Sequence, residues 1–280
     1  MKLKLLTFSG VWILALLCAP SLALAQLSSF AVLGGSTVTN TNTPTVVTGN
    51  LGVSPGSAVT GFPPGIVTGG TIHTADAVAG QAQVDLTTVY NTVAGLPCTT
   101  DLTGQNLGGL TLTPGVYCFS TSAQLTGTLT LNAQGISNAA FAFKMGSTLT
   151  TASASSVLLI NGGSACGVYW QVGSSATLGT GTSLLGTIAA LTSITLNTGA
   201  NLNGRALARN GAVTLDSNNA SDCTGGPGLP GLPGFNGVFG TSNTNTNALG
   251  TPALTMPVLA GLALLLAGLG WVLLSKAKAL

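Results

Sequence analysis

Few side chains in this chain could carry acid–base or nucleophilic chemistry. Its 280 residues include one His and five acidic residues, all of them Asp, and only 4% are charged, where an ordinary soluble domain has about 25%. A Ser-His-Asp triad would have to use His73, yet no Gly-x-Ser-x-Gly nucleophile turn is present, so we interpret His73 as a surface or capping residue. Asp216 and Asp222 are the closest carboxylates, but they flank a Ser/Asn-rich segment and do not form the pair that glycoside cleavage needs. We therefore predict no catalytic residue.

The cysteines predict disulfides and no metal site. Apart from Cys18, the sequence contains Cys98, Cys118, Cys166 and Cys223, an even number, and it has neither a Cys-x-x-Cys motif nor a second His for zinc. Three pairings are open. We favour Cys98–Cys118, which are about one repeat apart, and this leaves Cys166–Cys223; each closure would add roughly 3 kcal/mol of stability. We expect no cofactor.

The N-terminal segment, residues 1–25, predicts an export signal. Lys2 and Lys4 precede an apolar stretch, and Ala23-Leu24-Ala25 has the small-residue pattern of a cleavage site. We therefore expect an exported protein, placed at the cell surface or outside the cell.

The C-terminal segment, residues 257–280, predicts a membrane span or a sorting tail. Pro257–Leu274 contains no charge and is just long enough, at 1.5 Å per residue, to cross a bilayer core of about 30 Å. Lys276 and Lys278 follow it and favour a cytoplasmic C-terminus. Residues 224–256 are rich in Gly, Pro, Asn and Thr and form the expected linker, so the working domain is residues 26–223.

A repeat of 18–19 residues predicts the architecture. Thr-Leu pairs recur with spacings of 19, 18, 29, 18 and 19 residues, and the long interval contains an insertion around Asn161–Tyr169. Their threonines are Thr111, Thr130, Thr148, Thr177, Thr195 and Thr214. This period suits one turn of a β-solenoid, whereas a β-sandwich with coincidental spacing is the alternative. Because strand side chains alternate, we expect the six leucines to stack inward and the six threonines outward.

One segment departs from the repeat and predicts a long helix over about residues 75–94. Thr74 can cap it, Gly95 can end it, and Val78, Ala82, Leu86, Val89 and Val93 form a helical stripe. Its length of about 30 Å would let it lie along the solenoid. The chain would enter through residues 30–72, follow the helix and return as turns over residues 107–215.

The low charge excludes several partners. A formal net charge of +2 provides no basic field for nucleic acid, and residues 26–252 carry 3 basic and 5 acidic side chains, a net charge of 3 − 5 = −2. Arg205 and Arg209 alone do not make the charged groove that is typical of parallel β-helix polysaccharide lyases. We expect the domain to be monomeric.

The chain is abundant instead in neutral hydroxyl and methyl groups. It contains 40 Thr residues, and a second set of small side chains follows the corners of the turns. That set, our first candidate for a binding face, comprises Thr151, Ser153, Thr180, Thr182, Thr198, Ala200 and Ser217. The six threonines of the Thr-Leu pairs form the alternative face. Either face could order water, although Thr is also simply a good strand residue.

Several motifs resemble those of the secreted ice-binding proteins. They are Phe30-Ala31-Val32-Leu33-Gly34-Gly35, Gly49-Asn50-Leu51-Gly52-Val53, Leu110-Thr111-Leu112-Thr113-Pro114-Gly115-Val116-Tyr117 and Gly204-Arg205-Ala206-Leu207-Ala208. The resemblance covers residues 28–223 and implies a right-handed, discontinuous β-solenoid of triangular section with one long helix beside it. It also implies that one flat face adsorbs to an ice crystal. The family's T-[AG]-x-[TN] motif is matched at Thr198–Asn201, while Thr180–Ser183 and Thr151–Ala154 depart in the last place.

The resemblance predicts a protein that inhibits ice growth or recrystallisation without catalysis, at or released from the cell surface. The alternative function is that of a surface adhesin or an envelope structural protein built on the same scaffold.

Overall fold

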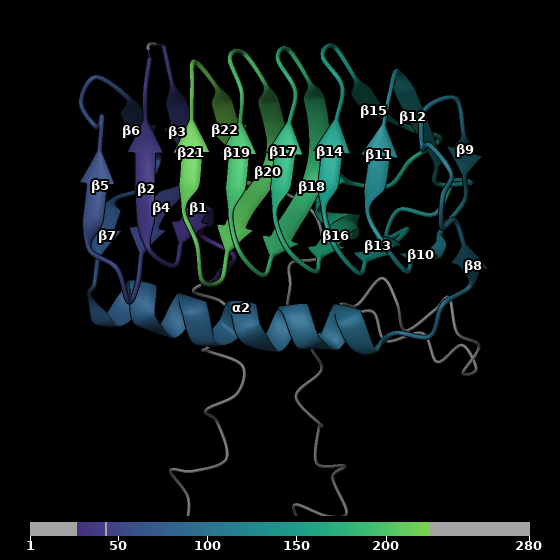
Figure 1. The fold of residues 1–280 in the computed structure, drawn as a ribbon, viewed down its shortest axis with the longest axis horizontal. Coiled ribbons are helices and arrows are strands. Elements are labelled where there is room, and N and C mark those ends of the chain that lie inside the picture. The colour runs from purple at the N-terminus through teal and green to yellow at the C-terminus, as the bar shows by residue number, and fades with distance from the viewer. Residues whose placement is uncertain (1–26, 43, 224–280) are drawn as a thin grey trace, which may run out of the picture. The chain divides into compact units, whose positions relative to one another are not determined.

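The computed structural model describes residues 27–42 and 44–223, so the predicted signal, linker and C-terminal tail lie outside the described residues. Their strands pair in parallel throughout and form the three faces of a solenoid (Figure 1). No helix within residues 27–42 and 44–223 is long and apolar enough to cross a membrane.

The first face, called the seven-stranded face, is a continuous sheet of short strands. Its order is β11 (Ala123–Leu125), β14 (Leu149–Thr151), β17 (Ala176–Leu178), β19 (Ile194–Leu196), β21 (Val213–Leu215), β2 (Thr37–Asn40) and β5 (Ala58–Thr60). On most of these strands the central residue points outward between two buried neighbours, as the period of a half-buried strand requires. Figure 1 shows these strands side by side, all pointing the same way.

The second face, called the second open face, is less regular. Its order is β9 (Thr111–Leu112), β12 (Thr128–Asn132), β15 (Ser156–Ile160), β18 (Ser183–Ala190), β20 (Asn201–Ala208), β22 (Asn219–Ser221), β3 (Val46–Thr48) and β6 (Ile66–Thr68). The eight-residue strands β18 and β20 continue around a corner and also belong to the third face.

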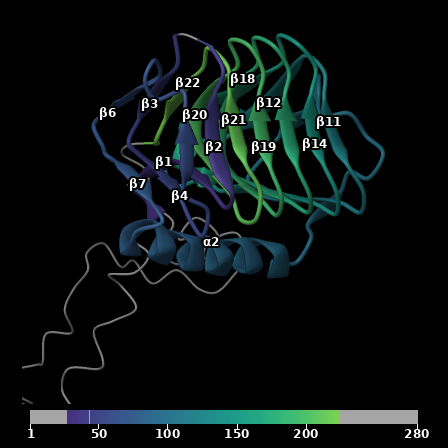
Figure 2. The same ribbon diagram turned by 60° about the vertical axis from the view of Figure 1, so that its left-hand side comes forward.

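The third face, called the helix-covered face, packs against α2 (Ala77–Gly95). Besides the far halves of β18 and β20 it contains β8 (Thr100–Asp101), β10 (Gly115–Phe119), β13 (Phe141–Met145), β16 (Val168–Val172), β1 (Phe30–Gly34), β4 (Asn50–Val53) and β7 (Ile72–Thr74). Figure 2 shows α2 lying along the stack below the strands.

The chain path confirms the predicted discontinuity. The N-terminal strand β2 pairs with β21, and β3 pairs with β22, so the first turns stack on the last ones. Helix α2 then carries the chain along the stack, and the turns from β8 onward return towards the N-terminal strands. Strands that are distant in sequence are therefore neighbours in one sheet.

The helix matches the prediction closely, except for its cap. It begins at Ala77, and Asp76 rather than Thr74 is the N-cap, since the Oδ1 atom of Asp76 accepts a hydrogen bond of 2.8 Å from the Ala79 N–H. Thr74 is instead the last residue of β7. The buried helix side includes Leu86 and Val93, as the stripe predicted.

The predicted single column of leucines is wrong. Leu131 lies opposite Leu112 on the second open face, whereas Leu178 lies opposite Leu196 on the seven-stranded face. Although Leu131, Leu149, Leu178, Leu196 and Leu215 are all fully buried, they line different walls of the core. The repeat length counts residues per turn, and it does not by itself show on which face a dipeptide falls.

The two disulfides confirm the favoured pairing. Cys98 is bonded to Cys118 with a Cα–Cα distance of 5.9 Å, and Cys166 to Cys223 with 5.3 Å, both ordinary separations. The first bond joins the segment that follows α2 to β10. The second joins the insertion, which contains the 3-10 helix η1 (Ala165–Gly167), to the last residue that the structure describes.

Candidate functional site

Three residues of the first candidate face are buried and cannot contact a solid surface. Thr151, Thr182 and Ala200 have exposed fractions of 3%, 0% and 0%. Thr151 occupies a core position, opposite Leu125, and its hydroxyl lies 2.7 Å from that of Thr182 and accepts from the Gly179 N–H at 2.8 Å. The two hydroxyls form hydrogen bonds with backbone groups inside the corner of the solenoid. They are therefore not part of an exposed face.

The remaining members of that set lie on turns at the corner that follows the seven-stranded face. Ser153, Thr180 and Thr198 are exposed, and Ser217 is half-buried. The Thr198 hydroxyl donates a hydrogen bond of 2.6 Å to the carboxylate of Asp216. That bond, foremost, and a second one from Asn42 lower the pKa of Asp216, so this corner carries a negative charge.

The alternative threonine set is split by the structure. Thr177, Thr195 and Thr214 lie opposite one another in register on the seven-stranded face. Thr111 and Thr130 are paired with each other on the second open face instead. The structure therefore supports half of the predicted column as one row.

The row is longer than sequence spacing indicated. Thr150 lies opposite Thr177 at one end, and Thr39 and Thr60 continue the row beyond Thr214. Gln124, opposite Thr150, ends the row on β11. Six threonines on consecutive strands thus stand in one line, and we call them the threonine row.

A second row runs beside it, formed by the residues two positions earlier in the sequence; Thr37 and Ala58 are the first residues of β2 and β5, and the other five directly precede their strands. Because side chains alternate along a strand, these residues face the same side as the threonine row. They are Ser122, Thr148, Ser175, Ser193, Ala212, Thr37 and Ala58. All are small, none is charged, and the Thr148 hydroxyl donates to that of Ser122 at 2.8 Å. We call the threonine row and this second row together the hydroxyl array.

The array is a regular two-dimensional grid. Adjacent strands are about 4.8 Å apart and residues two positions apart along a strand about 6.6 Å, so hydroxyl and methyl groups recur at both spacings. The Thr60 hydroxyl donates to that of Thr39 at 3.2 Å, which shows how closely the rungs stack. Such a grid holds polar and apolar groups on a plane.

The other two faces lack this regularity. The helix-covered face is occupied by α2, which buries Leu86 and Val89 against it. The second open face exposes the large apolar side chains of Leu158 and Ile66 among asparagines. Apart from Gln124 at its end, the seven-stranded face alone among the three presents outward side chains that are all small.

Three of the residues considered for catalysis contact other residues of the fold. His73 Nδ1 lies 2.7 Å from an oxygen of Asp76, the helix cap, and its Nε2 lies 2.8 Å from the Thr71 hydroxyl. Arg205 is buried, and Arg209 stacks over the Tyr90 ring at 4.7 Å. In the part of the chain that the structure describes, no three His, Cys, Asp or Glu residues are placed to hold a metal ion.

Comparison with known proteins decides the family. A sequence model described as "Ice-binding-like" matches residues 32–221. The chain belongs to this ice-binding-like family. An ice-binding protein of Nostoc sp. (strain HG1) is 64% identical over 200 residues, covering 71% of this chain and 73% of the relative.

Solved structures of the ice-binding-like family have the same fold. The crystal structure of an ice binding protein from an Antarctic biological consortium is 49% identical, with a TM-score of 0.69, and the match covers 71% of this chain and 90% of that one. The ice-binding protein of the Antarctic ascomycete Antarctomyces psychrotrophicus is 41% identical, with a TM-score of 0.68 and coverage of 71% and 96%. The expected solenoid with a flanking helix is confirmed.

Proposed function

We propose that this protein binds ice and that the hydroxyl array is its ice-contacting surface. The observation that carries the proposal is the register of the threonine row, in which Thr150, Thr177, Thr195, Thr214, Thr39 and Thr60 occupy consecutive rungs. Relatives that are named as ice-binding proteins support ice as the ligand. The regular, uncharged array supports the choice of face.

The array would bind by holding water in an ice-like arrangement. Threonine methyl groups restrict where water can lie, and the hydroxyl groups fix it by hydrogen bonds. Each contact is weak, but the contacts act together on a rigid plane, so little conformational entropy is lost on adsorption. Ice then grows between adsorbed molecules as a curved front, which opposes further growth.

Rigidity comes from the core beneath the array. Val38, Ile194, Leu196 and Val213 alternate with the outward threonines and are fully buried. Inside the stack, Phe143 lies between Tyr117 and Trp170, with ring centroids 5.4 and 4.1 Å away. A close-packed core has low compressibility, so it holds the strands above it in place.

The exposed corner residues Ser153, Thr180 and Thr198 form the border of the proposed surface, beyond the strands. Asp216 next to them binds water strongly as a carboxylate, so we place the edge of the ice contact before this charge. No step of the proposed function involves catalysis.

Ice-affinity adsorption tests the proposal. The full chain should enter slowly grown ice, whereas Thr177→Tyr combined with Thr195→Tyr should remain in the liquid because two rings project from the plane. Thr130→Tyr on the second open face is the matched control and should enter ice like the unchanged protein. Exclusion of the unchanged chain from the ice would refute ice binding. Exclusion of the Thr130→Tyr control alone would show that the second open face is the ice-contacting surface.

Export and surface display form the last part of the proposal. The signal-like segment 1–25 and the apolar segment 257–280 support it. Fractionation of cells would place the protein in the membrane if the tail is retained, or in the medium if it is removed; recovery in the cytoplasm would contradict export.

A further inference from the structure

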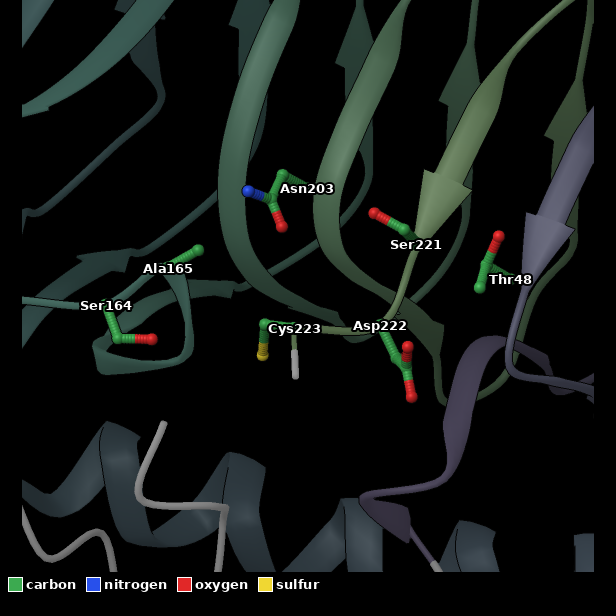
Figure 3. A pocket seen from close by; sticks show the side chains of 7 residues that line it. All are labelled: Thr48, Ser164, Ala165, Asn203, Ser221, Asp222 and Cys223. Atoms are coloured by element: carbon green, nitrogen blue, oxygen red, sulfur yellow. The ribbon is translucent and has the colours of Figure 1, made fainter. Parts of the chain in front are cut away.

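A polar pocket opens on the second open face, away from the hydroxyl array. It has a volume of about 340 Å³, at the lower end of the range of small-molecule sites. Its polar lining consists of Thr48, Ser164, Asn203, Ser221 and Asp222. Figure 3 shows strand residues on one side and the insertion on the other.

The strand wall of the pocket is a row of polar side chains in register. Asn203 on β20 lies opposite Ser221 on β22, and Ser221 lies opposite Thr48 on β3. The side chains of Asn203, Ser221 and Asp222 make no hydrogen bond within the described residues, so their donors and acceptors are available to a ligand. These three neighbouring polar side chains are at least partly open to solvent and form a hydrogen-bonding surface on one wall.

The opposite wall is fixed in place by the second disulfide. Cys166 in η1 is bonded to Cys223, and the Ser164 hydroxyl caps the same short helix by accepting from the Cys166 N–H at 3.2 Å. The guanidinium of buried Arg205 donates to the Cys223 sulfur at 2.9 Å and to the Ser28 carbonyl at 2.9 Å. The pocket is therefore already formed without a ligand, which lowers the entropic cost of binding.

The charges around the pocket select the ligand class. The Asp222 carboxylate disfavours phosphates and acidic sugars. A divalent cation is disfavoured too, because it needs six or so oxygen ligands with more negative charge, and buried Arg205 already interacts electrostatically with Asp222. Hydroxyl, amide and carboxylate groups without an aromatic or long aliphatic wall suit a neutral polyhydroxylated molecule.

We propose that this pocket binds a neutral sugar unit of a polysaccharide. Asp222 would accept hydrogen bonds from two sugar hydroxyls, Asn203 would donate and accept, and Ser221 would complete the set. The methyl group of Ala165 and the sulfur of Cys223 provide the small apolar contact for the C–H face of the ring. Because the hydroxyl array lies on another face, the protein could hold a polysaccharide and ice together.

Titration of the ¹⁵N-labelled full chain with methyl glycosides of glucose, galactose, mannose and xylose tests this site. We expect at least one glycoside to shift the amide signals of Ser164, Asn203 and Asp222, and glucuronate to shift them far less. Asn203→Ala and Asp222→Ala should each weaken binding about tenfold, the effect of losing hydrogen bonds of this kind. Asn219→Ala, an exposed asparagine on the neighbouring β22 outside the pocket, should leave binding unchanged.

Several outcomes would overturn the proposal: no response to any of the four glycosides, shifts that map to other residues, equal weakening by Asn219→Ala, or the same shifts with calcium chloride alone. Ice adsorption of Asn203→Ala provides an independent measurement and should equal that of the unchanged protein. The sugar site can thus fail while ice binding stands, or the reverse.

Discussion

Thr177 lies directly opposite Thr195 in the seven-stranded face, and both side chains point outward between buried neighbours. A parallel ladder repeats this relationship with every added turn, because equal positions on successive strands stay in register. The 18-residue interval between these two threonines is therefore also a translation of about 4.8 Å in space. Repetition in sequence becomes a regular array of chemical groups on a plane.

Two substitutions three residues apart distinguish a role of the hydroxyl array in ice binding from a role of the corner that borders it. Thr195→Tyr adds a ring in the middle of the threonine row and should remove most thermal hysteresis. Thr198→Tyr adds the same ring on the corner and should retain most of it. Both positions are on the surface, so each free energy of unfolding should stay within about 0.5 kcal/mol of the unchanged protein, measured by urea unfolding. Activity that survives Thr195→Tyr but not Thr198→Tyr would assign the corner as the site.

Lengthening the row should raise activity. Gln124 ends the threonine row on β11, where its long amide side chain interrupts the pattern of short hydroxyl and methyl groups. Gln124→Thr would extend the threonine row by one rung, and we expect higher thermal hysteresis at equal protein concentration. Gln105→Thr, at an exposed position in the loop after β8, is the control. An equal change from both variants would contradict a role for the row.

The sequence was sufficient to predict the repeat and the helix, whereas it left three cysteine pairings open and only favoured the observed one. The solenoid period follows from spacing, and the helix from its stripe of Leu86, Val89 and Val93. These features are local in sequence or repeat along it. Local patterns constrain local structure directly, which is why these predictions agree with the fold.

The membership of the surface rows could not be predicted in the same way. Thr39 and Thr60 join the row because the N-terminal turns stack on β21, a contact between distant segments. Thr150 rather than Thr148 is in the row because the turn containing the insertion is not a whole number of repeats long. Thr151 is buried because it lies opposite Leu125, on the side of the strand that faces the core. Each case depends on tertiary register, which dipeptide spacing does not encode.

Replacing a buried hydroxyl should lower stability without changing the ice surface. Thr151→Val keeps the shape of the side chain but removes the acceptor for the Gly179 N–H and the partner of Thr182. Leaving such groups unsatisfied costs about 1–3 kcal/mol. Urea unfolding should show this loss, while ice adsorption below the unfolding transition should be unchanged. Thr150→Val, one residue away but exposed, should cost less than about 0.5 kcal/mol. Equal losses at both positions would contradict the buried role of Thr151.

The carboxyl of Asp85 should make stability depend on pH. It is 3% exposed in α2, Gln81 donates to one of its oxygens at 2.8 Å, and the other oxygen has no partner in the part of the chain described. Burial raises the pKa of this carboxyl, and the Gln81 bond only partly opposes the shift. The folded state therefore holds its proton more tightly than the unfolded chain, whose Asp pKa is about 3.9.

The sign of the effect follows from proton linkage. The contribution of Asp85 to stability is fully present below the unfolded pKa and is lost as the pH rises through the raised folded pKa. Asp85→Asn carries no titrating proton, so its free energy of unfolding relative to the unchanged protein should increase between about pH 4 and pH 7. Asp101→Asn is the opposite control: hydrogen bonds from Thr103 lower the pKa of the exposed Asp101, so that variant should lose relative stability as the pH rises towards the unfolded pKa of about 3.9 and should change little between about pH 5 and pH 7. Urea unfolding at a series of pH values measures both, and a pH-independent difference for Asp85→Asn would show that this carboxyl titrates alike in the folded and unfolded states.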